Sequence, residues 1–102
     1  MNAAAPPRST VAIDYDGTWT ADPVAFEAFA CLLARRGHTV ILVTQRSTGH
    51  REVREAARCE GITAVVFAAK MSKRKACRAA LFEVDIWIDD NPVSVGFEVA
   101  RS

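Results

Sequence analysis

Carboxylates at the ends of apolar runs are the residues of this sequence best suited to chemistry. Asp14 and Asp16 flank one tyrosine after the run VAI and are followed directly by a glycine and a threonine. A second pair, Asp89 and Asp90, closes the run VDIWI. If the fold brings the two pairs together, their negative charges repel one another unless a cation lies between them. A ligand set made only of oxygens suits Mg²⁺, so the sequence predicts a magnesium site.

Two further side-chain types are complementary to a phosphoryl group. Thr44 ends the apolar run TVILV, and Lys70, Lys73 and Lys75 follow the run TAVVFAA. A hydroxyl and an ammonium group can both donate to phosphoryl oxygens. An aspartate can attack phosphorus as a covalent nucleophile. A second aspartate two residues away can give a proton to the leaving oxygen and later take one from water.

The segments that must position these side chains alternate between strands and helices. The apolar, β-branched runs predict strands at 10–14, 39–44, 63–69 and 84–89, of the kind buried on both faces of a parallel sheet. Caps and glycines predict helices from Pro23 to Gly37, from about His50 to Glu60 and from Lys73 to Phe82, with a short helix in the tail from Pro92 onwards. Core-facing helix residues are expected to be Phe26, Phe29, Ala30, Leu33, Ala76, Ala79 and Ala80.

Strands that alternate with helices predict right-handed βαβ units. We therefore expect one α/β domain over residues 10–102, with helices on both faces of a parallel sheet of four to five strands. The fold class that we predict is three-layer and Rossmann-like, with the strand order 4-1-2-3. Residues 1–9 are expected to form a flexible arm. Because such sheets bind ligands at the carboxyl ends of their strands, the acidic pairs and the threonine should meet there.

Composition narrows the function classes. The chain has 102 residues with 13 basic and 12 acidic side chains, a balance that argues against binding nucleic acid through bulk charge. Local basic clusters at 46–58 and 70–78 leave a nucleic-acid partner open. Three widely spaced cysteines predict neither a disulfide framework nor a zinc site. With no signal peptide and no apolar run of about 20 residues, we expect a cytoplasmic protein that does not enter a membrane.

The motifs together resemble those of a known family. The segments DYDGT (14–18) and VT (43–44), a lysine at the start of a helix and DD (89–90) are similar, in this order, to the four signatures of haloacid dehalogenase (HAD) superfamily hydrolases. The resemblance covers the chain from Val11 to about Val95. The four signatures in order are far more specific than any one of them.

The resemblance implies a role for each motif residue. Asp14 would be the nucleophile that forms an aspartyl-phosphate, and Asp16 the general acid and base, with its backbone carbonyl on the metal. Thr44 would hold a phosphoryl oxygen. Lys73 would neutralise charge beside the nucleophile, with Lys70 as the second choice.

The acidic pair would complete the metal site. Asp90 is expected to bind Mg²⁺ while Asp89 orients the lysine, so the implied metal residues are Asp14, Asp16, Asp89 and Asp90. The residues expected to contact substrate lie in or directly after the first two motifs: Gly17, Thr18, Trp19, Gln45 and Arg46.

The activity that the resemblance implies is a Mg²⁺-dependent phosphatase of the small, capless type. The segment between Asp16 and the second strand has about 22 residues, which one helix uses up, so no cap domain fits. Capless relatives act on large or exposed phosphorylated substrates, and a polynucleotide or nucleotide phosphatase is one subtype. A homo-oligomer, in which a partner subunit supplies the lid, is also possible.

Other interpretations of the motifs remain open at this point. An EF-hand loop starting at Asp14 fails, because its glycine and glutamate positions are Trp19 and Ala25. Each motif alone could be a turn or a solvated helix face. A non-catalytic phosphoryl-accepting switch is a second function, although receiver domains place the acidic pair before the acceptor strand. A binding module without turnover is a third.

Overall fold

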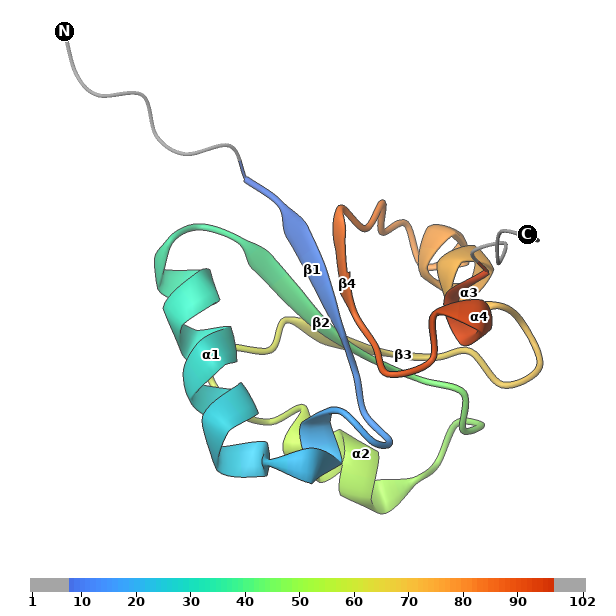
Figure 1. The fold of residues 1–102 in the computed structure, drawn as a ribbon, viewed down its shortest axis with the longest axis horizontal. Coiled ribbons are helices and arrows are strands. Elements are labelled where there is room, and N and C mark those ends of the chain that lie inside the picture. Colours follow the sequence, from blue (N-terminus) through green and yellow to red (C-terminus); the bar gives the residue numbers. More distant parts are fainter. Residues whose placement is uncertain (1–7, 97–102) are drawn as a thin grey trace, which may run out of the picture.

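The computed structural model describes residues 8–96 and forms one α/β domain around a four-stranded, all-parallel sheet. The strands are β1 (Thr10–Asp14), β2 (Thr39–Thr44), β3 (Ala64–Phe67) and β4 (Ile86–Ile88), in the spatial order β3-β2-β1-β4. This is the predicted order read from the other edge. The predicted parallel sheet is therefore confirmed, with β3 and β4 shorter than their apolar runs (Figure 1).

Helices cover both faces of the sheet, and the sheet separates the core into two clusters. Alternate residues of β1 and β2 point to opposite faces, so Ile13 and Leu42 lie in one cluster while Ala12 and Ile41 lie in the other. The first cluster packs against α1 (Pro23–Arg35) and α2 (Arg51–Ala56). The second packs against α3 (Lys73–Ala79), and α4 (Pro92–Val95) lies beside α3 (Figure 1).

Helix α1 begins and ends as its sequence predicts. The Asp22 side chain accepts a hydrogen bond from the Ala25 amide at 3.1 Å, and Pro23 occupies the first turn, where its missing N–H costs nothing. Gly37 follows the helix with φ of +91°, a conformation that glycine adopts without a steric penalty. A short 3-10 helix, η1 (Trp19–Ala21), precedes α1 and was not expected.

Two helices are shorter than their sequence patterns indicate. Helix α2 ends at Ala56 instead of Glu60, because the chain turns towards Gly61 and packs on the backbone of α1. Helix α3 ends at Ala79 instead of Phe82, because Leu81 adopts φ of +67° and the Phe82 amide bonds back to the Cys77 carbonyl. This is a Schellman ending with leucine at the position that glycine usually takes.

Three residues expected in the core are exposed instead. Phe29 lies on the outer face of α1, and Ala79 and Ala80 lie at the exposed end of α3. Phe26, Ala30, Leu33 and Ala76 pack in the core as expected.

The parallel sheet gathers the motif residues at one edge, which we call the carboxyl edge. Strands β1 and β2 end there at Asp14 and Thr44, and Asp89 and Asp90 follow β4. The loop after β3 returns α3 to the same edge, so Lys73 begins its helix there. Residues 1–7 of the expected arm and the tail from residue 97 lie outside the described residues. No helix within 8–96 has the length and apolarity that crossing a bilayer requires.

Substituting Gly61 with alanine tests the contact that shortens α2. A Cβ atom at position 61 would lie 2.5 Å from the Ala30 carbonyl carbon and from the Cys31 amide nitrogen. We expect Gly61→Ala to lower the free energy of unfolding by about 1–3 kcal/mol, measured by urea denaturation. An uncrowded glycine outside the left-handed region would instead gain about 0.4–1 kcal/mol from the same change. A more stable variant would therefore contradict the contact.

Candidate active site

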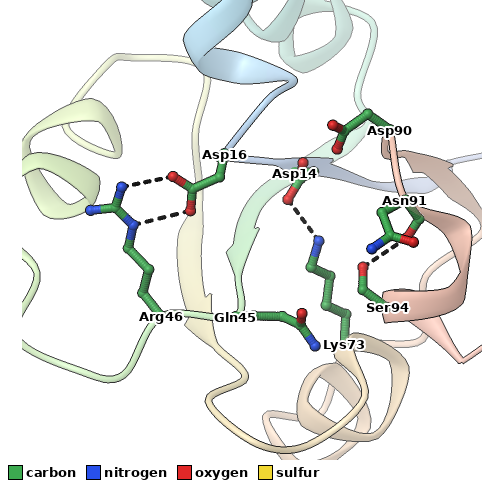
Figure 2. A pocket seen from close by; sticks show the side chains of 8 residues that line it. All are labelled: Asp14, Asp16, Gln45, Arg46, Lys73, Asp90, Asn91 and Ser94. Atoms are coloured by element: carbon green, nitrogen blue, oxygen red, sulfur yellow. Dashed lines mark hydrogen bonds and ion pairs between the residues drawn. The ribbon is translucent and has the colours of Figure 1, made fainter.

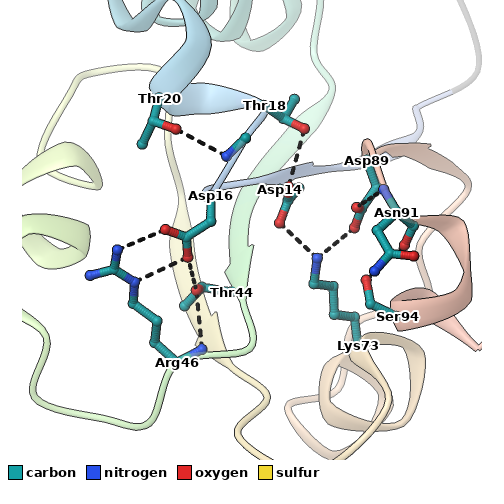
Figure 3. A network of polar contacts seen from close by, with 11 residues as sticks. Asp14, Asp16, Thr18, Thr20, Thr44, Arg46, Lys73, Asp89, Asn91 and Ser94 are labelled. Atoms are coloured by element: carbon teal, nitrogen blue, oxygen red, sulfur yellow. Dashed lines mark hydrogen bonds and ion pairs between the residues drawn. The ribbon is translucent and has the colours of Figure 1, made fainter.

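Asp14 lies at the centre of the carboxyl edge, buried at the end of β1. Its Oδ1 atom accepts a hydrogen bond from the Lys73 ammonium at 2.7 Å, and its Oδ2 atom accepts one from the Thr18 hydroxyl at 3.1 Å. Thr18 is itself buried, four residues further along the turn. The carboxylate is thus held from both sides before any ligand is bound (Figure 3).

Lys73 joins the first and last motifs through one buried ammonium group. Its Nζ atom lies 2.6 Å from Asp89 Oδ2 as well as 2.7 Å from Asp14 Oδ1. Burial alone would lower the pKa of Lys73, but the hydrogen bonds to Asp14 and Asp89 raise it above its ordinary value. The lysine is therefore charged, as a buried ion pair with satisfied partners requires. Lys70, the second choice for this position, is exposed in the loop after β3.

Burial raises the pKa of the Asp14 carboxyl group and so makes its carboxylate more basic. Desolvation raises its pKa from 3.8 to about 6, although the hydrogen bond from Lys73 opposes the shift, and the neighbouring Asp90 and Asp89 add to it. A carboxylate with a raised pKa and little solvation is a better nucleophile than one in water. Burial and the neighbouring carboxylates disfavour the ionised form of Asp14, and a bound cation would stabilise that form.

Three carboxylates at this edge could hold a cation. One oxygen from each of Asp14, Asp89 and Asp90 can be chosen so that all three lie within 4.8 Å of one another. These are hard oxygen ligands of the type that Mg²⁺ selects. Asp90 approaches the first motif so closely that a Cβ atom at Gly17 would lie 2.4 Å from its Oδ2 atom. Glycine at position 17, with φ of +86°, thus leaves room for this carboxylate.

Within the acidic pair the two residues face different partners. Asp89 accepts hydrogen bonds from the Lys73 ammonium and from the Asn91 amide at 2.8 Å. Asp90 is exposed and lines the pocket beside Asp14. The geometry therefore leaves Asp90 more accessible to a metal than Asp89, and the metal role of each remains a prediction.

Asp16 belongs to a separate, more exposed network. Arg46 binds its carboxylate with two hydrogen bonds, Nε to Oδ2 at 3.0 Å and Nη2 to Oδ1 at 2.7 Å. The same guanidinium pairs with Glu52 of α2 and lies over the Tyr15 ring, 5.5 Å from its centroid. The hydrogen bonds from Arg46 hold the pKa of Asp16 below its ordinary value. Asp16 is therefore ionised in this structure.

Thr44 supports this second network. Its hydroxyl lies 3.2 Å from Asp16 Oδ2 and accepts a hydrogen bond from the Arg46 amide at 3.2 Å. The side chain is fully buried at the end of β2. Its expected contact with a phosphoryl oxygen remains a prediction, since the hydroxyl is engaged with Asp16 here.

A pocket of about 400 Å³ lies between the two networks (Figure 2). Its lining residues are Asp14, Asp16, Gln45, Arg46, Lys73, Asp90, Asn91 and Ser94. Asn91 and Ser94 were not anticipated as site residues. The available signal was the Asn-Pro sequence after the acidic pair, which starts α4 and turns the first residues of that helix towards the site.

The residues expected to contact substrate separate into two groups. Gln45 and Arg46 line the pocket, but Arg46 is paired with Asp16. Trp19 was expected at the mouth of the site and instead is 4% exposed, in the core, with its ring 6.4 Å from that of Phe26. The turn to η1 directs the indole inward, which the position of Trp19 next to the motif did not reveal.

Comparison with known proteins adds no identification. No protein-family model, no curated protein and no solved structure matches this chain.

Replacing the buried carboxylate tests its protonation. Because the pKa of Asp14 is about 6 in the folded chain and 3.8 ordinarily, the folded chain binds the extra proton between these values, and wild type loses stability as pH rises through about 6. Asparagine has no proton to lose. We expect the difference in unfolding free energy between Asp14→Asn and wild type to shift in favour of the variant by up to about 3 kcal/mol as pH rises from 4 to 8, measured by urea denaturation in EDTA.

The metal supplies the control for this measurement. Mg²⁺ should raise the melting temperature of wild type at pH 8 more than that of Asp14→Asn, because a ligand stabilises the state that binds it. A constant difference between the two proteins across the pH range would contradict a raised pKa at Asp14.

Proposed function

We propose that this protein is a Mg²⁺-dependent phosphatase that acts through an aspartyl-phosphate on Asp14. The observation that carries the proposal is the buried Asp14 carboxylate, which contacts the Lys73 ammonium and shares a three-carboxylate cluster with Asp89 and Asp90. A nucleophile, a fixed positive charge and hard oxygen ligands thus lie around one pocket. These are the groups that phosphoryl transfer needs, because its catalysis rests on positioning and charge neutralisation.

The motif order gives this proposal independent support. The side chains that resemble the four HAD signatures come from β1, β2, α3 and the end of β4, and they meet at one edge of the sheet. We infer that the chain is a small, Rossmann-like HAD phosphatase without a cap, since η1 and α1 fill the segment between β1 and β2. An open site of this kind suits large or exposed phosphorylated substrates.

The proposed reaction has two steps. In the first, an Asp14 oxygen attacks phosphorus, the bond from phosphorus to the leaving oxygen breaks, and Asp16 gives that oxygen a proton. In the second, water attacks the aspartyl-phosphate, Asp16 takes a proton from the water, and the bond between Asp14 and phosphorus breaks to release inorganic phosphate. Bound Mg²⁺ would supply positive charge against the phosphate and the carboxylates. Lys73 offsets part of the negative charge of Asp14 and Asp89 throughout.

Arg46 sets the protonation state of Asp16 in this reaction. With both guanidinium bonds in place, Asp16 is ionised and is ready to act as the base of the second step. To act as the acid of the first step, Asp16 must be protonated, and this requires that its hydrogen bonds with Arg46 weaken. A substrate phosphate entering the pocket offers Arg46 alternative oxygens, so the arginine can exchange one anionic partner for the other.

The alternative functions fit the site less well. A phosphoryl-accepting switch needs an aspartyl-phosphate that persists. Asp16 lines the pocket beside Asp14 and is ionised, so it would act as a base that promotes hydrolysis of the aspartyl-phosphate. A binding module would not need that base. A polynucleotide or nucleotide phosphatase stays a subtype of the proposal, with Arg46 and Lys73 as basic groups at the pocket.

Release of phosphate from p-nitrophenyl phosphate tests the proposal directly. We expect turnover in Mg²⁺, none in EDTA, and loss of turnover in Asp14→Asn, because the amide cannot act as the nucleophile. Asp22→Asn is the matched control, since it makes the same change at an exposed helix cap that asparagine also caps well. Mg²⁺-dependent turnover that survives Asp14→Asn would refute the assigned nucleophile.

A second readout separates the phosphatase from the switch. After treatment with acetyl phosphate, intact-mass measurement of a switch would show a lasting gain of one phosphoryl group. The proposed enzyme should show none in wild type, because Asp16 promotes hydrolysis. An Asp16→Asn variant should retain the group.

A conservative change at Arg46 tests its role in positioning Asp16. Arg46→Lys keeps the charge but loses the paired hydrogen bonds, so we expect kcat to fall roughly 10- to 100-fold with a smaller change in KM. Arg51→Lys, in an exposed ion pair on α2, is the control and should be unchanged. A rise in KM alone would assign Arg46 to substrate binding instead.

A further inference from the structure

We propose that the outer face of α1 is a two-fold interface on which a second copy of this chain docks antiparallel to the first. The face consists of Val24, Ala25, Ala28, Phe29 and Leu32, which we call the outer stripe. All five are exposed, Val24 to 79% and Leu32 to 58%. Helix α1 lies on the outside of one face of the sheet (Figure 1). The stripe residues are exposed and belong to the side of α1 that does not pack in the core.

The stripe is unusual because α1 is apolar on both sides. Phe26, Ala30 and Leu33 already pack against the sheet, so the core needs no further apolar residues from this helix. Positions 24, 28 and 32 follow one line along the helix surface, and 25 and 29 follow the next. A helix that is apolar all round is normally buried all round. We therefore expect the stripe to be covered by another protein surface.

The side chains of the stripe are complementary to those of a second copy. If two α1 helices pack antiparallel about an axis between positions 28 and 29, Ala25 faces Leu32 of the other copy and Ala28 faces Phe29. Leu32 and Phe29 each then meet an alanine, which lets the helices approach closely. The stripe carries no charge, so no like charges oppose the contact.

Charges at the two ends of the helix favour the same arrangement. The exposed Asp22 precedes α1, and the exposed Arg35 ends it. In the antiparallel register, Asp22 of each copy faces Arg35 of the other, so one two-fold axis creates two ion pairs. The helix dipoles also align favourably, with each N-terminus beside a C-terminus. A parallel pair would bring like charges together at both ends.

The proposed interface leaves the candidate active site open. The pocket is lined by residues of the carboxyl edge, α3 and α4, and the stripe contributes none of them. Changes in the stripe can therefore be tested for association separately from activity.

The test is the mass of the full-length chain in solution, measured by sedimentation velocity over a range of concentrations. We expect wild type to be a dimer. Leu32→Glu should weaken the dimer at least roughly 30-fold, because it places a charge near the centre of the contact. Arg35→Glu, which sets like charges opposite Asp22, should weaken it less and more strongly at low salt. Leu81→Glu is the matched control and should stay dimeric, because Leu81 is 93% exposed at the end of α3.

Three outcomes would overturn the proposal. A wild-type chain that stays monomeric at the highest soluble concentration would do so, as would a dimer that Leu81→Glu disrupts and Leu32→Glu does not. Residues 1–7 are a competing occupant, since Arg8 lies near Gly37 at the end of α1. A chain that lacks them and dimerises where wild type does not would assign the stripe to that segment. Circular dichroism of each variant shows that it has folded.

Discussion

The Lys73 ammonium between Asp14 and Asp89 is the contact on which the site depends. It joins three segments that are far apart in the sequence, the ends of β1 and β4 and the start of α3. Buried carboxylates without this partner would be uncompensated charges, and removing one member of such a pair costs about 3–5 kcal/mol. The ammonium therefore ties the start of α3 to the ends of β1 and β4 and holds the nucleophile of the proposed phosphatase in one position.

The two aspartates of the first motif acquire opposite properties from this arrangement. Asp14 is buried, and desolvation raises its pKa to about 6, whereas Asp16 is exposed and its pKa is lowered by two hydrogen bonds from Arg46. Neighbouring groups whose environments separate their pKa values are typical of acid–base sites. The pairing of Arg46 with Glu52 extends this control to α2, so a helix outside the pocket contributes to the state of the proposed general base.

Helix ends show where sequence patterns lose their predictive value. Helix α1 has the predicted bounds because its ends are set by local residues, Asp22 and Pro23 at the start and Gly37 after the end. Leu81 gives no such signal, because leucine rarely adopts the left-handed conformation that ends α3 here. Helix α2 ends early because Gly61 contacts the backbone of α1, a contact between segments about 30 residues apart that no local pattern encodes.

The sequence by itself determined the parallel sheet, its strand order and the gathering of Asp14, Thr44, Lys73 and the acidic pair at one edge. The sheet and the strand-end positions follow from apolar runs and from the geometry of βαβ units, which are properties of local segments. The strand order and the choice of Lys73 over Lys70 came with the resemblance to the four HAD signatures. Only the tertiary structure decided which partner each polar group contacts: Lys73 against Asp89, Arg46 against Asp16, and Trp19 in the core instead of the pocket. Those choices depend on side-chain directions and on the cost of burying charge, which are fixed only when all the elements have packed.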